Sequence, residues 1–499
     1  MIAKPGSHRT MALRMGPVSE RLGKTWTSVQ NVPASWSLAF VLSVNLALVL
    51  WTGAAVLRHF PNSGDEYAYF ISAVLFSEGR LSTESPEPRE SFNFNHVVNN
   101  GKYYGKYPPG WPALLSLGIL ARAPWIINPI LGTLTLFTLY RIGREHFSRE
   151  TATAALLLTL ANPFFILNSA SYFSHPSCLL FVTLAVHFGL RAVKNPSSVR
   201  DPVLFGAAGA AAFCARPFTA LAFLLPVALY FLSSGPRSVP TSPYVRGRAL
   251  GCGVALAGFS LFLVYNALQT GDPFKQPVSV YDPSEGVGRT PGSQSWAWAV
   301  ENNGWGRLRD LNEWIPGCLV GCAAYLVQFW RRKAEPAGAL LLLCFIGLAG
   351  GYFCYLYHPG NQYGPRYLYE ASGVLFLVLG SVLSRMKILG LPLLVLVVLT
   401  NVALLSAEVA DRRDQINGRM QVYDRVREAG LSRAVIFLRT GSGSMEARDL
   451  TRNGVHFEQE PILYVRDLGA ANAEVLENYP GRQAFVFEEG RLVPWSERR

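Results

Sequence analysis

The stretch that organises this chain is Ser63-Gly-Asp-Glu-Tyr-Ala-Tyr-Phe-Ile-Ser-Ala-Val-Leu-Phe76, which follows the first long apolar segment. Its apolar side chains recur at helical spacing and predict an amphipathic helix over 66–79, lying on a membrane surface. They are Tyr67, Phe70, Ile71, Val74 and Leu75. Ser63 and Glu66 also fit a capping box, and acids at a helix start favour the helix dipole. The Asp65-Glu66 pair therefore has a structural explanation beside a chemical one.

The composition around this stretch is that of a membrane protein. Half of the 499 residues are hydrophobic and only 16% are charged, against about a quarter in a soluble protein. Such a chain has enough apolar surface to bury that disorder is excluded. Long apolar runs recur from residue 36 to residue 407, which does not fit an ordinary soluble enzyme. The cysteines all lie in or beside apolar stretches, and they support neither a disulfide framework nor a zinc ribbon.

The apolar runs predict an α-helical polytopic protein, since about 20 apolar residues cross a bilayer. Candidate spans lie at about 36–57, 109–121, 124–141, 151–168, 175–191, 203–215, 217–233, 249–267, 314–330, 337–356, 368–384 and 388–407. The segments 109–121 and 203–215 are short. Arg122-Ala-Pro124 divides residues 109–141, although orientation requires an odd number of crossings there. We therefore predict about 11 to 12 spans.

Lys and Arg in short loops predict the orientation. The basic tail 1–35 and five later groups belong on the cytoplasmic side by this rule. The groups are Arg141/Arg144/Arg149, Arg191/Lys194/Arg200, Arg237/Arg246/Arg248, Arg331/Arg332/Lys333 and Arg385/Lys387. Outward loops at 59–108 and 268–313 then interrupt a transmembrane domain spanning 36–407. The net charge of +12 reports this orientation, and the dispersed basic residues give no support to nucleic-acid binding.

Residues 408–499 differ in character from the transmembrane domain. Short apolar runs at Ala434–Leu438, Ile462–Val465 and Ala484–Glu488, with a helix at about 469–478, predict a small α/β domain. By the same orientation this domain is extracytoplasmic, and it lies on the side of the first long loop.

The first loop ends in Asn99-Asn-Gly-Lys-Tyr-Tyr-Gly-Lys-Tyr-Pro-Pro-Gly-Trp111, and Pro-Pro-Gly marks where the next helix starts. An acidic pair after the first span, an amphipathic helix and a Tyr-Pro-Pro entry together resemble the GT-C integral-membrane glycosyltransferases. The resemblance is closest to the branch that uses polyprenyl-phosphate sugars, which includes protein O-mannosyltransferases and the lipid A aminoarabinose transferases of bacterial cell envelopes. It extends over roughly 35–407 and includes later motifs. These are Ala215-Arg216-Pro217, Tyr265-Asn266, Thr270-Gly-Asp-Pro273 and Tyr363-Gly-Pro-Arg366-Tyr367-Leu368.

Transfer of a sugar from a lipid phosphate to a hydroxyl requires a carboxylate for the acceptor proton and cations for the departing phosphate. The resemblance assigns the carboxylate to Asp65, with Glu66 as the alternative that spacing leaves open. Arg216 interrupts an apolar stretch, where an unpaired cation is costly, and Arg366 offers a guanidinium suited to phosphate. The structural explanation of Arg216 is snorkelling to the interface, and that of Arg366 is simple anchoring. The other candidates for the donor site are Lys102, Lys106, Tyr107, Arg289 and Tyr363.

Three histidines face outward by this orientation, namely His96, His175 and His358. Some relatives use a metal, and these side chains with Asp65 are the candidate ligands for a divalent ion, although no close-spaced pair supports one. Lipid A-modifying relatives carry a second acid in the next outward loop, where this chain has Ser171-Tyr-Phe-Ser-His175-Pro. Either His175 replaces that acid as a hydrogen-bonding or metal-binding group, or the second acidic role is missing.

The sequence therefore predicts a hexosyl- or pentosyltransferase in the cytoplasmic membrane, with a cytoplasmic N-terminus. It would transfer a sugar from a polyprenyl-phosphate donor to a hydroxyl of a glycan, lipid or protein on the outer face, by inverting single displacement. A transporter or flippase of lipid-linked or glycan substrates is the alternative. Such a protein would carry ionisable residues deep inside several spans, whereas nearly all the charges here lie at span ends.

Overall fold

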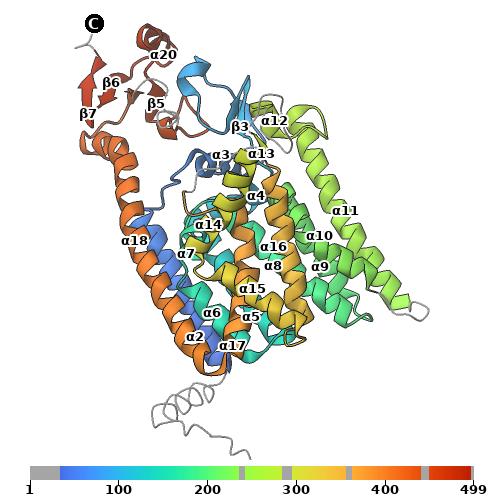
Figure 1. Ribbon diagram of the computed structural model, residues 1–499. Helices are drawn as coiled ribbons and strands as arrows, with labels where there is room; N and C mark the ends of the chain where they lie inside the picture. Colours follow the sequence, from blue (N-terminus) through green and yellow to red (C-terminus); the bar gives the residue numbers. More distant parts are fainter. Residues whose placement is uncertain (1–33, 235–241, 284–294, 356–361, 440–448, 496–499) are drawn as a thin grey trace, which may run out of the picture.

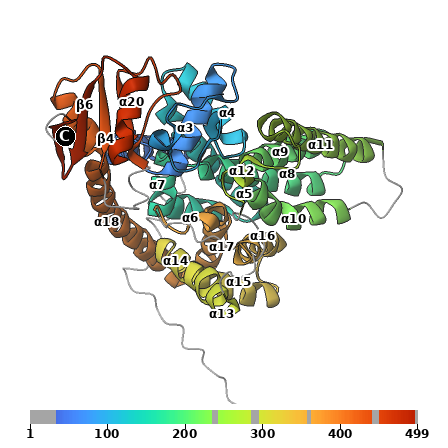
Figure 2. The same cartoon turned by 90° about the horizontal axis from the view of Figure 1, so that it is seen from above.

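The computed structural model describes residues 34–234, 242–283, 295–355, 362–439 and 449–495. A bundle of long helices fills most of the molecule, and both small β-sheets lie at one end of it (Figure 1). The end that carries the first loop and the C-terminal domain is called the loop face below. Figure 2 shows these two regions side by side above the bundle.

Each predicted apolar segment contains a helix. Outside the first loop, the helices of the bundle are α2 (Ala34–Trp51), α5 (Ile127–His146), α6 (Arg149–Leu160), α7 (Pro163–Ala170), α8 (His175–Lys194), α9 (Arg200–Ala215), α10 (Pro217–Ser233), α11 (Ser242–Thr270), α15 (Cys318–Trp330), α16 (Pro336–Phe353), α17 (Ser372–Arg385) and α18 (Lys387–Glu428). A π-helical turn, η1 (Thr52–Val56), extends α2. Within the described residues, 7 helices are long and apolar enough to cross a membrane, or up to 8 if the bent pair α6–α7 is one span. The predicted α-helical polytopic fold class is confirmed.

The helix α4 (Gly110–Leu120) explains why residues 109–141 are divided. Its 11 residues measure about 16 Å, half the thickness of a hydrocarbon core. It begins at Gly110, which lies against the backbone of Ala215, and the short η3 (Pro124–Ile126) after it brings Trp125 to 4.8 Å from the His59 ring. Both neighbours belong to the loop face. Within residues 109–141, the helix that begins at Pro124 is therefore a candidate membrane span by length, and α4 is only a shorter apolar helix.

The first loop folds into a helix and a small sheet. The helix α3 (Gly64–Ser77) is followed by strands β1 (Thr83–Glu84), β2 (Val97–Asn99) and β3 (Lys102–Gly105), which pair antiparallel in the order β1-β3-β2. A 3-10 turn, η2 (Arg89–Phe92), lies between β1 and β2. Gly105 approaches α3 so closely that a Cβ there would lie 2.4 Å from the carbonyl oxygen of Ala68. The predicted amphipathic helix thus packs against α4 on one side and β3 on another, instead of lying open on the membrane surface.

The C-terminal domain is carried on α18, a helix of 42 residues and about 63 Å that runs through the predicted boundary at 407/408. The sheet that follows contains β4 (Ala434–Leu438), β5 (Ile462–Arg466), β6 (Gln483–Glu488) and β7 (Arg491–Pro494), in the order β5-β4-β6-β7. The pairs β4–β5 and β4–β6 are parallel, and β6–β7 is antiparallel. A short 3-10 turn, η6 (Gly469–Ala471), leads into α20 (Asn472–Asn478) between β5 and β6.

The C-terminal sheet and the first loop share one hydrophobic core. One face of β4, with Ala434 and Ile436, packs on Val422 and Val426 of α18. The opposite face, with Val435 and Phe437, joins a cluster that includes Ile71 of α3 and Tyr103 of β3. Burial of this shared apolar surface fixes the C-terminal domain against the loop, so that it forms part of the loop face.

The second long loop is mostly helical where it is described. It contains α12 (Pro277–Tyr281), α13 (Trp296–Trp298), the π-helical η4 (Ala299–Gly306) and α14 (Arg307–Trp314). A 3-10 helix, η5 (Arg366–Ala371), precedes α17 and brings Arg366 to the loop face. Of these elements, α12 and η5 contribute to the wall of the site described next.

Candidate active site

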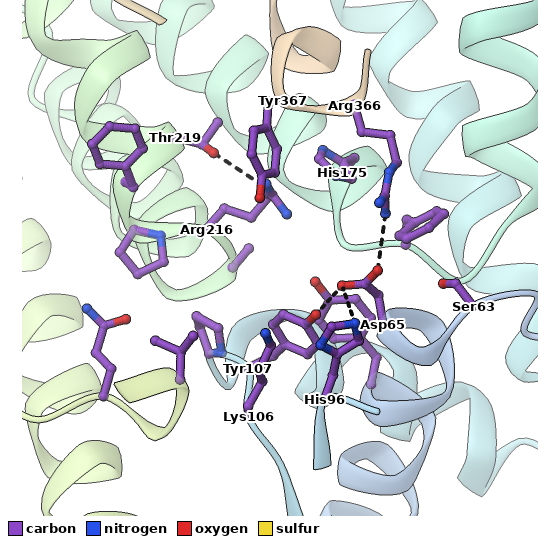
Figure 3. A pocket seen from close by; sticks show the side chains of 18 of the residues that line it. Ser63, Asp65, His96, Lys106, Tyr107, His175, Arg216, Thr219, Arg366 and Tyr367 are labelled. Carbon is purple, nitrogen blue, oxygen red and sulfur yellow. Dashed lines mark hydrogen bonds and ion pairs between the residues drawn. The ribbon is translucent and has the colours of Figure 1, made fainter. Parts of the chain in front are cut away.

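A cavity of about 540 Å³ opens at the loop face between the bundle and the first loop. Its walls come from the start of α3, the end of β3, the α9–α10 turn, η5 and the C-terminal domain. The titratable side chains among its lining residues are Asp65, Tyr69, His96, Lys106, Tyr107, His175, Arg216, Tyr352, Tyr355, Arg366, Tyr367 and Asp449. Figure 3 shows Asp65, His96, Lys106 and Tyr107 on one side of this space, and Arg216, Arg366 and Tyr367 across from them.

Asp65 stands in the first turn of α3 and faces the cavity. Its carboxylate accepts a hydrogen bond from the Tyr107 hydroxyl and lies 3.4 Å from Nη1 of Arg366 and 3.9 Å from Nε2 of His96. Burial raises the pKa of the Asp65 carboxyl, but His96, Arg366, the Tyr107 hydroxyl and Lys106 outweigh burial and hold it well below its usual range. Burial lowers the pKa of His96 to about 4. At neutral pH the ring is therefore uncharged, and the two cations and the hydroxyl keep the carboxylate ionised.

Glu66, the next residue, is 1% exposed and does not line the cavity. Its Oε1 accepts a hydrogen bond from the backbone N–H of Tyr172, and its Oε2 accepts one from the Ser63 hydroxyl. The Ser63 hydroxyl in turn accepts from the N–H of Glu66, so Ser63 is the N-cap of α3, at the position that the capping-box spacing predicted. Burial raises the pKa of Glu66 to about 7, against its hydrogen bond from Tyr172. The fold thus gives the two neighbouring carboxyls different environments, one facing the cavity and one within the protein.

Arg216 connects two helices, because it is the C-cap of α9 and directly precedes Pro217 at the start of α10. Its guanidinium donates to the hydroxyls of Ser174 at 3.0 Å and Tyr352 at 3.3 Å. The same group lies 3.3 Å from Glu370, a fully buried carboxyl in η5. A buried counter-charge of this kind keeps the guanidinium in place beside the cavity.

Glu370 was not predicted from the sequence, yet it bears on the missing second acid. His175 places Nδ1 3.2 Å from Glu370 Oε1, so His175, Arg216 and Glu370 form one buried cluster. The acid comes from η5, not from the loop that contains His175. An ionisable residue four positions after Arg366, at the start of an apolar stretch, was the sequence signal for it.

Arg366 and Lys106 complete the set of cations among the described lining residues. Arg366 stacks its guanidinium 4.2 Å from the ring of Phe173, and the same group points toward Asp65 (Figure 3). Lys106 is 1% exposed, and its ammonium lies 4.7 Å from the ring of Tyr281 in α12. Rings of this kind favour a cation in a site from which water is mostly excluded.

The structure places the remaining candidates elsewhere. Lys102 is exposed on β3 and does not line the cavity, and Tyr363 is fully buried, with its hydroxyl accepting from Asn62. Arg289 and His358 lie outside the described residues. Among the residues that are described, no group of three or more His, Cys, Asp and Glu side chains is arranged to hold a metal ion.

The C-terminal domain contributes Asp449 to the cavity, which sequence analysis also did not predict. Its carboxylate accepts a 2.6 Å hydrogen bond from Asn95 and lies 3.7 Å from Arg419 of α18. Burial raises the pKa of Asp449 despite the Asn95 hydrogen bond and the Arg419 charge. A Cβ on Gly64 would lie 2.7 Å from this carboxylate, so glycine is required directly before Asp65.

Two solved structures similar to this chain along most of its length identify the fold. ArnT from Cupriavidus metallidurans bound to undecaprenyl phosphate is 12% identical, covers 91% of this chain and 93% of its own, and gives a TM-score of 0.56. The apo state of the same protein is 14% identical, with the same coverage and TM-score. The chain has the GT-C fold.

Further comparisons are more distant or partial. The family model of dolichyl-phosphate-mannose-protein mannosyltransferases matches residues 113–265, which include Arg216 but not Asp65. The apo oligosaccharyltransferase from Archaeoglobus fulgidus is 13% identical and covers 76% of this chain and 56% of its own, with a TM-score of 0.45. No curated protein matches the sequence.

Proposed function

We propose that this protein is a membrane glycosyltransferase that moves a sugar from a polyprenyl phosphate to a hydroxyl acceptor by inverting single displacement. The observation that carries the proposal is the ionised carboxylate of Asp65 in one cavity with Lys106, which lies on the same side, and with Arg216 and Arg366 on the other side. The family model of mannosyltransferases and the fold shared with ArnT, whose structure contains undecaprenyl phosphate, support the same chemistry.

Asp65 receives the acceptor proton in this proposal. The acceptor oxygen attacks the anomeric carbon as the bond from that carbon to the phosphate oxygen breaks, and the hydroxyl proton passes to the carboxylate. A depressed pKa makes Asp65 a weak base but keeps it ionised at every physiological pH. A weak base suffices late in the reaction, because the attacking hydroxyl becomes strongly acidic as its bond to the sugar forms.

The cations serve the leaving group. Polyprenyl phosphate departs with the electron pair of the broken bond, and negative charge grows on its oxygens in the transition state. Arg366 and Arg216 offer planar guanidinium groups to those oxygens, and Lys106 adds a third charge from the opposite wall. The buried Glu370 holds Arg216 in position, so the arginine costs little reorganisation during the reaction.

We place the loop face on the outer side of the cytoplasmic membrane, with the N-terminus inside. Basic residues concentrate at the opposite end of the bundle, as in the turns between α5 and α6, α8 and α9, and α15 and α16. In this orientation the cavity receives lipid-linked sugar from the outer leaflet, and the C-terminal domain lies outside. The acceptor is then a glycan, lipid or protein hydroxyl of the cell envelope.

The substitution Asp65→Asn tests the proposal. Surface glycans, lipids and glycoproteins of the source organism are compared by mass spectrometry between the wild type, a deletion strain and the deletion strain complemented with each variant. Asp65→Asn is expected to match the deletion strain, because the amide accepts no proton. Asp414→Asn, an exposed change on α18, is the matched control and should restore the wild-type pattern. Restoration by Asp65→Asn at equal membrane levels of protein would refute the assignment.

A further inference from the structure

A second cavity, of about 460 Å³, lies on the other side of α3 at the loop face. Asp65 and Tyr69 of this helix line the candidate active site, whereas Tyr67 and Phe70 line the second cavity. Its remaining walls come from the segment after η1, from Trp125 and from the C-terminal domain, including Arg452. Nothing in the proposed reaction uses this space, which is called the Arg452 cavity below.

Arg452 is a buried cation whose terminal nitrogens have no partner among the residues that the structure describes. The side chain is 7% exposed, and its Nε donates to the backbone carbonyl of Asp449 at 2.8 Å. Both Nη1 and Nη2 are buried and have no hydrogen-bond partner in the described part of the chain. Leaving a buried charged donor unsatisfied is costly, so these two nitrogens need a partner that the described residues do not supply.

The nearby acids do not meet this need. Glu66 directs its oxygens to Tyr172 and Ser63, and Asp449 directs its own to Asn95 and Arg419. None of the described residues that line the Arg452 cavity is acidic. These acids therefore leave the fork of the guanidinium unoccupied, and its geometry matches two oxygens of a carboxylate or a phosphate.

Aromatic rings form most of the wall around this cation. The Arg452 guanidinium lies 4.0 Å from the ring of Phe60 and 5.0 Å from that of Tyr67. Tyr423 and Tyr464 contact each other at 4.8 Å, and Trp125 packs on His59 across the opening. Flat rings with polar edges suit the apolar face of a sugar or another ring, since such a group buries area without losing its own hydrogen bonds.

We infer that the Arg452 cavity is a binding site for an anionic group, a carboxylate or a phosphate, carried on a sugar or similar ring. The next step rests on the proposed function. The ligand is then an acidic part of the acceptor, away from the hydroxyl that receives the sugar. The thickness of α3, about 10 Å with its side chains, separates the two cavities. An acceptor of a few sugar units therefore reaches both, and binding energy at Arg452 orients its hydroxyl at Asp65.

The inference is tested by titration calorimetry on the purified full-length protein in a neutral detergent. The probes are phenyl phosphate, phenyl β-D-glucuronide and the uncharged phenyl β-D-glucoside. Wild-type protein is expected to bind the phosphate at two classes of site, because the candidate active site also carries cations. Arg366→Gln should weaken one class, and Arg452→Gln the other, each by about tenfold or more, as loss of a charge-assisted pair predicts. The glucoside should bind at least tenfold more weakly than the better anionic probe.

Two further variants separate binding from folding. Arg452→Lys keeps the charge and the packing of the side-chain stem but loses the fork, so binding should weaken several-fold at an unchanged melting temperature. Arg427→Gln removes an exposed arginine of the same region and should leave binding as in the wild type. Equal binding by Arg452→Gln, Arg452→Lys and the wild type overturns the inference, and so does tight binding of the glucoside.

The same experiment distinguishes this inference from the proposed function. Asp65→Asn leaves the Arg452 cavity intact and should bind all probes there as the wild type does. If Asp65→Asn proves fully active in cells, the proposed function fails, yet the effect of Arg452→Gln on binding stands. If Arg452→Gln binds normally while Asp65→Asn is inactive, only the inference in this subsection is lost.

Discussion

The two cavities on either side of α3 use charge in opposite ways. The candidate active site surrounds one ionised carboxylate with several cations and hydroxyls that are held by buried partners. Among its described lining residues, the Arg452 cavity has one arginine between aromatic rings and no acid. The first arrangement can accept a proton and stabilise a departing anion, whereas the second can only bind. One helix thus separates a place for chemistry from a place for recognition.

The largest expected effect comes from comparing Lys102 with Lys106, because both lie near the end of the first loop but only Lys106 lines the candidate active site. Lys106→Gln is expected to lower the transfer rate by about a hundredfold, since removal of one preorganised charge from a reacting centre costs this much. Lys102→Gln, on the exposed side of β3, should leave the rate unchanged. Initial rates with the native donor in membranes measure both. Similar losses in the two variants would mean that net charge, and not position, is what matters.

Glu66 lies in α3 between the two cavities but lines neither of them. Substitution of Glu66 therefore tests the stability of the folded protein. Burial raises its pKa in the folded protein to about 7, above the unfolded value of 4.5. The folded state then binds more protons than the unfolded state between these values, so stability is greatest below pH 4.5 and falls as the pH rises through 7. The loss amounts to about 3 kcal/mol. The side chain of Glu66→Gln stays neutral at every pH. The stability of this variant should therefore fall less than that of the wild type as the pH rises through 7.

Melting temperatures of wild type and Glu66→Gln at pH 5.5 and pH 8.5 measure this difference. The melting temperature of Glu66→Gln, relative to that of the wild type, is expected to be higher at pH 8.5 than at pH 5.5. Glu78→Gln, near the end of the same helix, is the control. Parallel curves for wild type and Glu66→Gln would show that Glu66 does not change its protonation in this range.

The smallest expected effect belongs to the rim of the Arg452 cavity. Trp125→Ala should raise KM for an acidic acceptor about fivefold and leave kcat unchanged, because a lost ring contact weakens binding by roughly 1 kcal/mol. Trp330→Ala, which removes an equally bulky exposed ring from the end of α15, should change neither constant. A drop in kcat for Trp125→Ala would mean that the Arg452 cavity also contributes to catalysis. The two cavities would then not differ as chemistry and recognition do.

Local patterns were sufficient to predict many elements of this fold. Apolar runs placed a helix in every predicted span, and Ser63 with Glu66 marked where α3 starts. The strand at Ala434–Leu438 was predicted to the residue, and those at 462–465 and 484–488 within one residue. The strand β7 was missed, because Arg-Leu-Val-Pro494 is too short to show alternation. Periodicity and capping are properties of neighbouring residues, which a sequence displays directly.

The site depended on contacts that neighbouring residues do not encode. Asp65 and Glu66 are adjacent, but only the packing of α3 against the turn at Tyr172 decides that Glu66 is enclosed and Asp65 faces the cavity. Glu370 joins His175 from a segment 195 residues away, and Asp449 reaches Asn95 across 354 residues. The sequence by itself determined the membrane-spanning helices, the start of α3 and most of the cations. Only the tertiary structure decided which charges meet, because pairing of buried charges depends on distance in space and on exclusion of water.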